Sequence, residues 1–341
     1  MKTLLVTGGA GFIGSHFVRH ILGKYPEYRV VNLDALKYAG NLDNLLDVAD
    51  DPRYRFVHGD IADAPLVEQL LREYQVSAVV NFAAETHVDR SLLDAGGFIL
   101  TDVHGTYVLL EAARRAGVER FLQVGTDEVY GHVEVGSTDE LSPLTPRSPY
   151  SASKAGGDLM VLAYHTSYGL PVVITRASNN LGPNQYPEKF IPLFVTNAID
   201  DEPLPLYGDG MQVRDWLYVV DHCEALDLVL HQGQVGEVYN VGGGNEKVNM
   251  EVAHRVLDTL GKSKELIKHV ADRPGHDRRY SLDCAKLHAL GWRPRHDFET
   301  ALDLTLRWYV ENEWWWRKIK TGEYMEYYRQ QYQARLEGVR G

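Results

Sequence analysis

The chain has 341 residues, of which 44% are hydrophobic and 24% are charged, as is ordinary for a folded globular protein. Its net charge is 35 − 47 = −12, which repels phosphate polymers and anionic lipid surfaces, so we expect neither nucleic-acid binding nor membrane association. Only two cysteines are present, and no apolar run approaches the ~20 residues that span a bilayer, which together favour a reduced protein in the cytoplasm.

Short apolar segments alternate with longer amphipathic ones through the first half of the chain. The apolar segments are rich in β-branched residues and almost free of charge, as strands buried on both faces are. This alternation predicts an α/β fold with a doubly wound parallel sheet. The predicted strands are 3–7, 29–33, 55–58, 78–82, 120–125 and 172–175, and the predicted helices between them are 15–25, 64–74, 101–117 and 151–168.

In the second half of the chain, the alternation of apolar and amphipathic segments is less regular. Residues 180–192 and 200–210 carry many Pro, Gly, Asn and Asp residues and predict long loops, which in compact proteins are often binding elements. The aromatic-rich segment 308–332 predicts a helical tail that packs on the protein, because aromatic side chains supply large buried areas. Further strands are predicted at 216–219 and 237–241, and further helices at 250–260 and 298–312.

We therefore predict two units. Residues 1–178, with a returning segment around 216–246, form the doubly wound Rossmann unit. Residues 179–215 and 247–341 form a smaller α/β lobe on its C-terminal side that binds a ligand.

A glycine-rich turn, Gly8-Gly9-Ala10-Gly11-Phe12-Ile13-Gly14, joins the first predicted strand to the first helix. Glycines 8, 11 and 14 permit a tight turn and a close approach of the backbone to a pyrophosphate. The helix N-terminus adds free N–H groups and the positive end of a dipole. This position between strand and helix predicts a dinucleotide site at Gly8, Gly11, Phe12, Ile13 and Gly14.

The ends of the next strands complete the predicted cofactor site. Asp34 ends the second strand, where a carboxylate accepts hydrogen bonds from ribose hydroxyls and repels a 2′-phosphate, so we expect NAD rather than NADP. Lys37 lies close by and softens that repulsion. Asp60 and Ile61 end the third strand near the expected adenine edge, although Asp60 equally suits the N-cap of helix 64–74. The small residues that follow the fourth strand leave room for the cofactor: Phe82, Ala83 and Ala84.

Tyr150 and Lys154 are four residues apart on a predicted helix and share one face. An ammonium group and a positive nicotinamide ring both lower the pKa of a phenol, so Tyr150 can act as the base in a hydride transfer. Thr126 would hydrogen-bond the same substrate oxygen. The adjacent acids Asp127 and Glu128 indicate a second step that moves a proton and expels a hydroxyl. Both acids reach one substrate only if the strand ends near Gly125 and the chain turns there.

These motifs resemble the extended short-chain dehydrogenase/reductase superfamily and, within it, the family of dTDP-glucose 4,6-dehydratases. The similarity runs over essentially the whole length. The glycine motif alone indicates the superfamily, whereas Thr126-Asp127-Glu128 and the late DRPGHDRRY stretch are typical of the dehydratases. The matching segments are GGAGFIGSH, NFAAETHVDRS, GTDEVYG, SPYSASK, NNLGPNQYPEKFIP, QVRDWLYV and DRPGHDRRY.

The resemblance implies a complete reaction. NAD oxidises C4 of the glucose of dTDP-glucose, Glu128 removes the C5 proton, Asp127 protonates the leaving C6 hydroxyl, and the hydride returns to C6. It also implies a homodimer in which helices 101–117 and 151–168 form a four-helix bundle with their symmetry mates. Apolar residues such as Val108, Leu109, Met160 and Leu162 are expected on the outer faces of these helices.

Further site residues follow from the resemblance. Thr101 and Asn180 join the cofactor site. Thr86, His87 and Thr126 lie near the sugar. The diphosphate, nucleoside and base are expected at Asn179, Lys189, Phe190, Pro205, Tyr207, Arg214, Asn249, Arg273 and His276.

The chain departs from the family pattern at a few positions. Asp102 and His104 stand where Asn and a neutral residue are expected, and Leu181 replaces an aromatic residue. Two alternatives stay open: a nucleotide-sugar 4-epimerase, which needs no acid and base at 127 and 128, and a catalytically silent NAD-binding regulator. Spacing typical of a metal site is missing, so no metal is expected.

Overall fold

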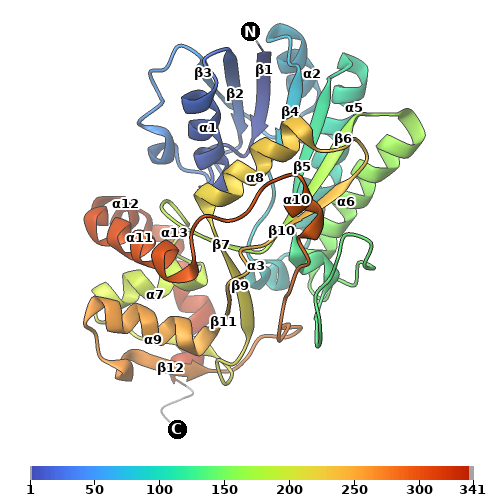
Figure 1. Cartoon of the computed structure of the whole chain (residues 1–341). Coiled ribbons are helices and arrows are strands. Elements are labelled where there is room, and N and C mark those ends of the chain that lie inside the picture. Colours follow the sequence, from blue (N-terminus) through green and yellow to red (C-terminus); the bar gives the residue numbers. More distant parts are fainter. Residues whose placement is uncertain (1, 338–341) are drawn as a thin grey trace.

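The largest element of the fold is a parallel sheet of seven strands (Figure 1). The computed structural model of the chain describes residues 2–337. The strand order is β10-β6-β5-β4-β1-β2-β3, and neighbouring strands are parallel throughout. The predicted doubly wound α/β class is therefore confirmed. The strands are β1 (Lys2–Thr7), β2 (Tyr28–Asp34), β3 (Tyr54–His58), β4 (Ala78–Asn81), β5 (Arg120–Thr126), β6 (Val172–Ala177) and β10 (Val238–Val241).

The strand order reverses between β1 and β4. From β1 the sheet continues through β2 and β3 on one side, and from β4 through β5, β6 and β10 on the other. The loops after β1 and β4 therefore leave the sheet in opposite directions. Ligands of open α/β sheets bind in the crevice that such a reversal creates at the carboxyl ends of the strands.

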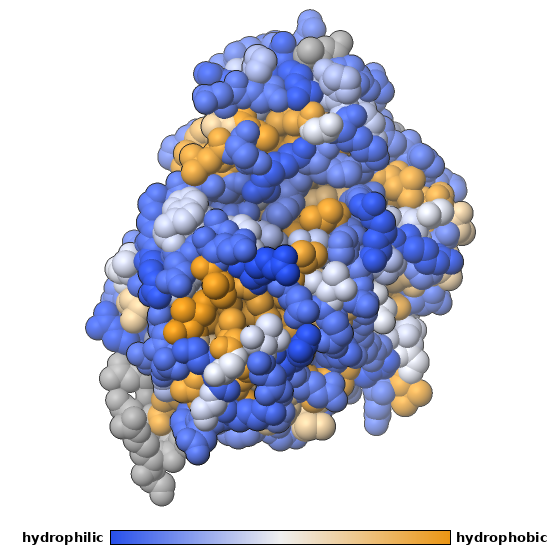
Figure 2. All heavy atoms as spheres, turned by 60° about the vertical axis from the view of Figure 1, so that its left-hand side comes forward, coloured by the Kyte–Doolittle hydropathy of each residue, from blue (hydrophilic) through white to orange (hydrophobic). Residues whose placement is uncertain are grey.

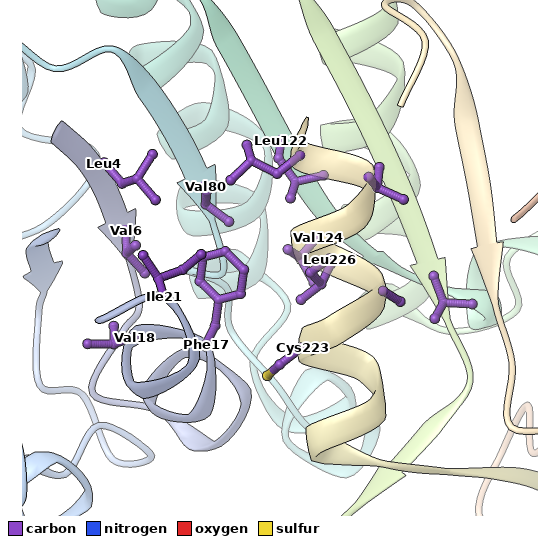
Figure 3. Close-up of a cluster of buried hydrophobic side chains, with 14 of the residues drawn as sticks. Leu4, Val6, Phe17, Val18, Ile21, Val80, Leu122, Val124, Cys223 and Leu226 are labelled. Atoms are coloured by element: carbon purple, nitrogen blue, oxygen red, sulfur yellow. The ribbon is translucent and has the colours of Figure 1, made fainter. Parts of the chain in front are cut away.

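Helices cover both faces of this sheet. On one face α1 and α8 pack together, and Figure 3 shows Phe17, Ile21 and Leu226 beside Val6 and Val80 of the strands. On the other face α2, α5 and α6 pack over a second buried cluster. Burial on both faces explains why the strands are apolar almost throughout. The helices are α1 (Phe12–Lys24), α2 (Ala64–Glu73), α5 (Thr106–Ala116), α6 (Pro149–Tyr168) and α8 (Val219–Gln232).

Two expectations about α5 are wrong. Val108 and Leu109, expected on its outer face, are only 4% and 0% exposed, because they share the inward-facing stripe of α5 with Ala112 and Ala113. Met160 and Leu162 of α6 are partly buried against the same cluster. In addition, the helix expected over 101–117 is not uniform, because a π-helical segment, η2 (Ile99–Gly105), precedes α5.

The ends of α2 and α6 follow from their sequences. The Asp63 side chain accepts a hydrogen bond from the backbone N–H of Leu66 and caps α2, so the alternative role of Asp60 as this cap is wrong. At α6, Ser148 and Ser151 form a capping box and Pro149 takes the first turn. Gly169 ends α6 at φ 69°, a left-handed conformation that favours glycine.

Two small sheets and a third core form the second half of the protein. One sheet has the order β11-β9-β7, and the other pairs β12 with β8. Buried residues such as Phe194, Trp216 and Leu302 join these elements. The elements are β7 (Asn179–Leu181), β8 (Leu204–Tyr207), β9 (Val213–Tyr218), β11 (Glu246–Val248), β12 (Ile267–Val270), α7 (Phe190–Ile199), α9 (Asn249–Leu260) and α11 (Phe298–Glu311).

The two predicted long loops are partly wrong. β7 and the first turn of α7 lie within the expected loop 180–192, and β8 lies within the expected loop 200–210. Strands this short take their stability from pairing with β9 and β12, which local composition does not reveal. The outermost residues of the predicted two-unit division, Met1 and 338–341, lie outside the described residues.

The aromatic C-terminal segment is helical and packs on the third core, as predicted. Trp315 and Trp316 are almost fully buried. Trp315 also reaches the N-terminal half: its Nε1 donates to the Asn44 side chain at 2.9 Å, and Asn44 Nδ2 donates to the carbonyl of Ala10 at 2.9 Å. The remaining helical segments are η1 (Leu42–Leu45), α3 (Val88–Leu93), α4 (Gly96–Phe98), η3 (Asp127–Tyr130), η4 (Lys264–Leu266), α10 (Ala285–Ala289), α12 (Glu313–Ile319), α13 (Gly322–Tyr328), η5 (Arg329–Gln333) and α14 (Ala334–Glu337).

Hydrophilic residues cover most of the face shown in Figure 2, and hydrophobic residues gather there in separate patches. Within residues 2–337, every helix is too short or too polar to cross a bilayer.

Candidate active site

A cleft opens at the carboxyl edge of the large sheet, where the strand order reverses. It encloses about 1250 Å³, part of it open to solvent. We call it the cofactor cleft. Of the sixteen residues predicted to bind the cofactor, all but Asn180 line it: Gly8, Gly11, Phe12, Ile13, Gly14, Asp34, Lys37, Asp60, Ile61, Phe82, Ala83, Ala84, Thr101, Tyr150 and Lys154.

Asn180 lies elsewhere. Its amide donates to the carbonyl of Ser178 at 3.0 Å, and its oxygen lies 2.9 Å from His222 Nδ1. Both groups of its side chain are therefore engaged within the protein. The sequence analysis also missed lining residues, among them Tyr38, Glu85 and Tyr186.

The glycine turn has no space for side chains. A Cβ on Gly14 would lie 2.4 Å from the carbonyl oxygen of Gly8, and one on Gly8 would lie 2.7 Å from the backbone nitrogen of Ala83. Gly8 has φ +68°. Gly11 caps α1 without a side-chain hydrogen bond, so the first N–H groups of the helix stay free for an anion. The turn fits a dinucleotide pyrophosphate.

The acidic residue at the end of β2 is held in place by the backbone. One oxygen of Asp34 accepts from the N–H of Ala10 at 2.9 Å and the other from Leu36 at 2.8 Å. Lys37 donates to Glu85 at 2.8 Å and lies 3.6 Å from Asp60. Because two carboxylates already balance its charge, Lys37 adds little attraction for a 2′-phosphate.

Tyr150 and Lys154 lie in the first turns of α6, at the inner end of the cleft. Lys154 Nζ donates to the carbonyl of Val124 at 3.1 Å. The pKa of Tyr150 is raised well above its ordinary value by burial and by the charges of Glu128 and Asp102. The expected lowering is therefore wrong for the protein alone, because two carboxylates oppose the phenolate.

Asp127 and Glu128 lie just past the end of β5. The strand ends at Thr126, and η3 begins at Asp127. Thr126 caps this turn: its hydroxyl accepts from the N–H of Glu128 at 3.3 Å and donates to Asp127 at 3.2 Å. The turn that the two acids require is therefore present, and on it Asp127 is buried and Glu128 is half-buried.

The charged groups around Asp127 and Glu128 shift the pKa values of the two acids by different amounts. Burial raises the pKa of both. Glu128 and Asp215 raise the pKa of Asp127 further, to well above its ordinary range, whereas Arg273, Arg214 and Lys189 oppose the rise at Glu128. Asp127 is therefore the acid that holds its proton more readily, and Glu128 is the acid that ionises more readily.

A second cavity of about 820 Å³ meets the cofactor cleft, because Tyr150 and Lys189 line both. We call it the cationic cavity, since Lys189, Arg214 and Arg273 all line it. Most residues predicted to bind substrate are brought together here: His87, Glu128, Asn179, Lys189, Phe190, Pro205, Tyr207, Arg214, Asn249, Arg273 and His276. Thr86 lines the cofactor cleft instead, and Thr126 and Asp127 line neither space.

Hydrogen bonds fix the cations of this cavity. Lys189 donates to Thr86 at 2.9 Å, and Arg214 Nη2 donates to the carbonyl of Asp277 at 2.9 Å. His276 has its pKa lowered to about 4 by burial and by Arg273 and Arg214, so it is neutral at pH 7. A protein of net charge −12 thus gathers three cations in one buried space, which suits a diphosphate.

Several lining residues were missed. Asp89 and Glu188 stand inside the quoted motifs HVDRS and PEKFIP, so the motifs could have indicated them. Tyr332 lies in the C-terminal segment that was expected only to pack, and no local signal marks it.

Asp102 is the departure from the family pattern that lies nearest the reacting groups. It is buried, and it accepts from the N–H of Glu85 at 2.9 Å and from the Ser153 hydroxyl at 2.6 Å. Burial raises its pKa to about 6. His104 stacks near Tyr107, with ring centroids 5.8 Å apart, and Leu181 is fully buried in the third core. Among residues 2–337, no group of three or more potential ligands is placed to hold a metal ion.

The family model described as GDP-mannose 4,6 dehydratase matches residues 5–305 of the chain. A dTDP-glucose 4,6-dehydratase of Streptomyces antibioticus is 54% identical over 323 residues, which are 93% of this chain and 95% of the relative. The chain belongs to the dTDP-glucose 4,6-dehydratase family. The resemblance inferred from its motifs is confirmed.

Solved structures agree with this family. The dTDP-glucose 4,6-dehydratase of Streptomyces venezuelae, solved with NAD bound, is 55% identical, superposes with a TM-score of 0.91 and covers 93% of this chain and 100% of its own. The UDP-glucose 4-epimerase of Thermus thermophilus, also solved with NAD, is 35% identical with a TM-score of 0.84, covering 91% and 99% of the two chains. Because epimerases share the fold, the site residues must decide the reaction.

Proposed function

We propose that this protein is an NAD-dependent hydro-lyase that converts dTDP-glucose to dTDP-4-keto-6-deoxyglucose. One observation carries the proposal: Asp127 and Glu128 stand together on the turn after β5, Asp127 buried and Glu128 lining the cationic cavity with Tyr150, which also lines the cofactor cleft. A 4-epimerase does not need a buried acid and base at this point.

The cofactor cleft fits NAD. The Gly8 and Gly14 positions have no room for a Cβ, the N-terminus of α1 is uncapped by side chains, and Asp34 stands at the end of β2. Asp34 would accept from the adenosine ribose, and the Gly11–Gly14 backbone would hold the pyrophosphate. When bound, NAD supplies the hydride acceptor for the first step and the hydride donor for the last.

Tyr150 removes the proton from the C4 hydroxyl in the oxidation. Its phenolate is opposed by Glu128 and Asp102, so the nearby ammonium of Lys154 and the positive charge of the cofactor must favour it. Thr126 holds the same substrate oxygen. The C4 ketone acidifies the C5 proton, because the resulting anion delocalises into the carbonyl.

The two acids then carry out the elimination. Glu128 takes the C5 proton, and the cations around it keep its carboxylate available. Asp127, whose pKa is raised by burial and by Glu128, donates its proton to the departing C6 hydroxyl. Reprotonation of C5 after hydride return to C6 restores Glu128. Tyr150 releases the proton of the C4 hydroxyl and Asp127 takes one up, which restores both groups and completes the cycle.

The cationic cavity would hold the rest of the substrate. Lys189, Arg214 and Arg273 neutralise the diphosphate, and His87 and Asn179 border the hexose. Pro205 and Tyr207 flank the base, with Asn249 and His276 nearby. These groups line the same cavity as Tyr150 and Glu128, so the sugar can reach the catalytic residues while the nucleotide stays bound.

The experiment is incubation of NAD-loaded protein with dTDP-glucose, followed by the absorbance of the 4-keto sugar in alkali and by nucleotide chromatography. A 4-keto-6-deoxy product is expected. Accumulation of dTDP-galactose would instead identify an epimerase. Binding of NAD and dTDP without any turnover would identify a silent regulator.

We also propose that the chain forms a homodimer through a four-helix bundle of α5 and α6 with their symmetry mates. Apolar residues are exposed on this face of the protein, at 41–62% for Ile99, Leu100, Tyr107, Leu159 and Tyr168. Burying them would require a partner. Sedimentation of the wild type and of Leu100→Glu tests this: a dimer that the substitution dissociates is expected, and a monomeric wild type contradicts it.

The predicted division of the chain and its cytoplasmic location remain proposals. The core of the seven-stranded sheet and the third core consist of separate buried clusters, which supports a Rossmann unit and a substrate-binding lobe. Cys223 and Cys284 are both buried and free, as suits a reducing compartment.

A further inference from the structure

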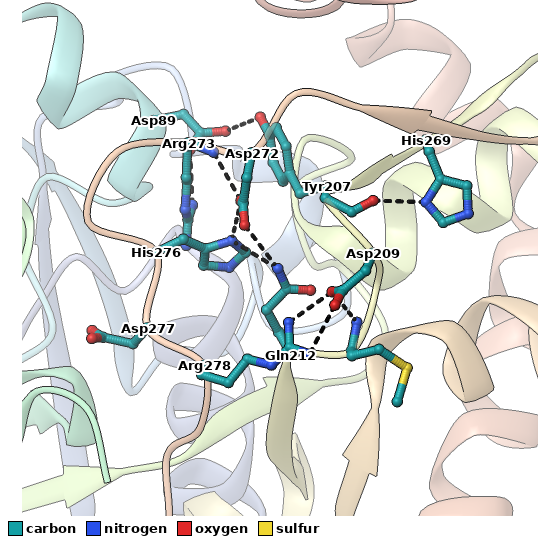
Figure 4. A network of polar contacts seen from close by, with 12 residues as sticks. Asp89, Tyr207, Asp209, Gln212, His269, Asp272, Arg273, His276, Asp277 and Arg278 are labelled. Atoms are coloured by element: carbon teal, nitrogen blue, oxygen red, sulfur yellow. Dashed lines mark hydrogen bonds and ion pairs between the residues drawn. The ribbon is translucent and has the colours of Figure 1, made fainter. Parts of the chain in front are cut away.

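Asp89 of α3 is a buried carboxylate for which the proposed reaction has no use. Its side chain is 1% exposed. It accepts from Arg273 Nη1 at 2.8 Å, from the Tyr207 hydroxyl at 2.7 Å and from Gln331 Nε2 at 3.0 Å (Figure 4 shows the first two partners). A carboxylate with three donors is fully engaged and fixed in orientation.

The three donors come from segments far apart in the chain. Arg273 belongs to the loop that follows β12, Tyr207 ends β8, and Gln331 lies in η5. Gln331 Nε2 also donates to the Tyr207 hydroxyl at 2.8 Å, and Arg335 Nη1 donates to it at 2.7 Å. The Tyr207 proton must therefore point at Asp89. One carboxylate thus joins three separate parts of the cavity wall.

The charge of Asp89 matters to this arrangement. Burial alone would raise the pKa of Asp89, but His87 and Arg273 more than offset burial and hold it well below the ordinary range. Asp89 is therefore ionised at neutral pH. Because a carboxylate repels a diphosphate, Asp89 cannot bind that group itself and must act through its donors.

Arg273 has donors left for a ligand. Asp89 holds Nη1, while Nε is buried and has no partner among the described residues. Arg273 lines the cationic cavity. When one nitrogen of a guanidinium is held in place, the other nitrogens point in a defined direction. Binding a phosphate then costs less conformational entropy.

We propose that Asp89 is a positioning residue for the nucleoside diphosphate: it aims Arg273 at the diphosphate and fixes Tyr207 and the η5 segment at the base. The proposal rests on the proposed function. It predicts that Asp89 controls the affinity for substrate and leaves the chemical step at C4, C5 and C6 unchanged.

The test is Asp89→Asn in the full-length, NAD-loaded protein, which removes the charge with little change in shape. The Kd of dTDP, measured by calorimetry, and the KM for dTDP-glucose are expected to rise about ten- to a hundredfold, as for loss of a charge-assisted hydrogen bond. The kcat is expected to stay within about threefold. An unchanged Kd and KM, or a fall in kcat at constant KM, overturns the proposal.

Asp209→Asn is the matched control. Asp209, in the loop between β8 and β9, pairs at 2.7 Å with Arg278, which lies in the same loop as Arg273, but Asp209 is exposed to solvent (Figure 4). Loss of an exposed pair costs little. Asp209→Asn should change the Kd of dTDP by less than about twofold, and a change as large as that of Asp89→Asn would show a general effect of the loop.

A double-mutant cycle with Arg273→Lys separates positioning from general destabilisation. Arg273→Lys keeps the positive charge and removes the planar guanidinium with its several N–H donors. If Asp89 acts through Arg273, Asp89→Asn should weaken dTDP binding much less in the Arg273→Lys background. The same factor in both backgrounds overturns the proposal.

Gln331→Leu provides a second variant should Asp89→Asn not fold. It removes one donor to Asp89 and leaves the buried charge in place, and a rise of about three- to tenfold in the Kd of dTDP at unchanged kcat is expected. An unchanged Kd overturns the role of η5.

The wild type distinguishes failure of this proposal from failure of the proposed function. A wild type that neither binds dTDP nor converts dTDP-glucose would contradict the proposed function itself. If the wild type does both, the variants test the role of Asp89.

Discussion

Backbone turns at the ends of neighbouring strands form most of the cofactor cleft, whereas side chains from distant segments form the cationic cavity. The cleft contains Gly8 to Gly14 in one stretch and Asp34 at the next strand end. The cavity brings Asp89, Tyr207, Arg273 and Tyr332 together from across the chain. The cofactor cleft is therefore sensitive to substitution at a few positions that are close together in the sequence. The cationic cavity instead depends on the folding of the whole second half of the protein.

Tyr150 belongs to both spaces, and its replacement should have the largest effect. Tyr150→Phe is expected to lower kcat about a thousandfold, because no other group replaces the general base. The affinities for NAD and dTDP should change by less than about threefold, since neither depends on the hydroxyl. Steady-state rates and calorimetry measure this, and a parallel loss of NAD affinity would show that the two spaces are not independent.

Glu128→Gln should affect the cavity side alone. An amide cannot take the C5 proton, so incorporation of solvent deuterium at C5 is expected to fall by at least about a hundredfold. Reduction of bound NAD by dTDP-glucose should persist, because Tyr150 and Lys154 remain. Deuterium exchange at the wild-type rate would remove Glu128 from this role.

Gly14→Ala should break the cofactor side alone. Its Cβ would lie 2.4 Å from the Gly8 carbonyl oxygen, so the turn must shift. NAD affinity is expected to fall about tenfold or more, while the Kd of dTDP changes little. Gly23→Ala is the control in the same helix, because a Cβ there has nothing within 4 Å. Equal NAD affinities for the two variants would contradict the importance of the turn.

Asp102→Asn should have the smallest effect of these substitutions, and the effect should be on the free energy of unfolding. Burial raises the pKa of Asp102 to about 6 from 3.8, so the folded protein binds more protons than the unfolded chain between these values, and stability falls as pH rises through this window. At pH 7.5 the variant should be more stable by about 1–3 kcal/mol. Thermal melting should show this gain shrinking as the pH falls from about 6 to about 4 and absent below about pH 4, and a gain independent of pH would contradict the titration of Asp102.

The same comparison explains what the sequence could predict. Most cofactor residues follow from strand ends, one glycine motif and the spacing of Tyr150 and Lys154, so local patterns placed fourteen of them in the cleft, and the resemblance added Thr101. The turn at Asp127 and Glu128 could also be predicted from the sequence, because adjacent residues of a strand point to opposite faces and could not both reach one substrate. The contact of Asn180 with His222 could not be predicted, since it depends on α8, which is distant in sequence.

The parts that could not be predicted depend on tertiary pairing. β8 lies in a segment whose composition is that of a loop, and it exists because β12 pairs with it. The raised pKa of Tyr150 depends on Glu128 and Asp102, which approach it only in the fold. Val108 and Leu109 were assigned to the wrong side of α5, because helical periodicity gives an apolar stripe but not the layer that covers it.

The hydrogen bonds from Trp315 to Asn44 and from Asn44 to Ala10 have a consequence for biosynthesis. Residue 315 leaves the ribosome 315 − 10 = 305 residues after residue 10. The glycine turn therefore acquires its final support long after it is synthesised, and a truncated chain that lacks α12 would present this turn without these hydrogen bonds.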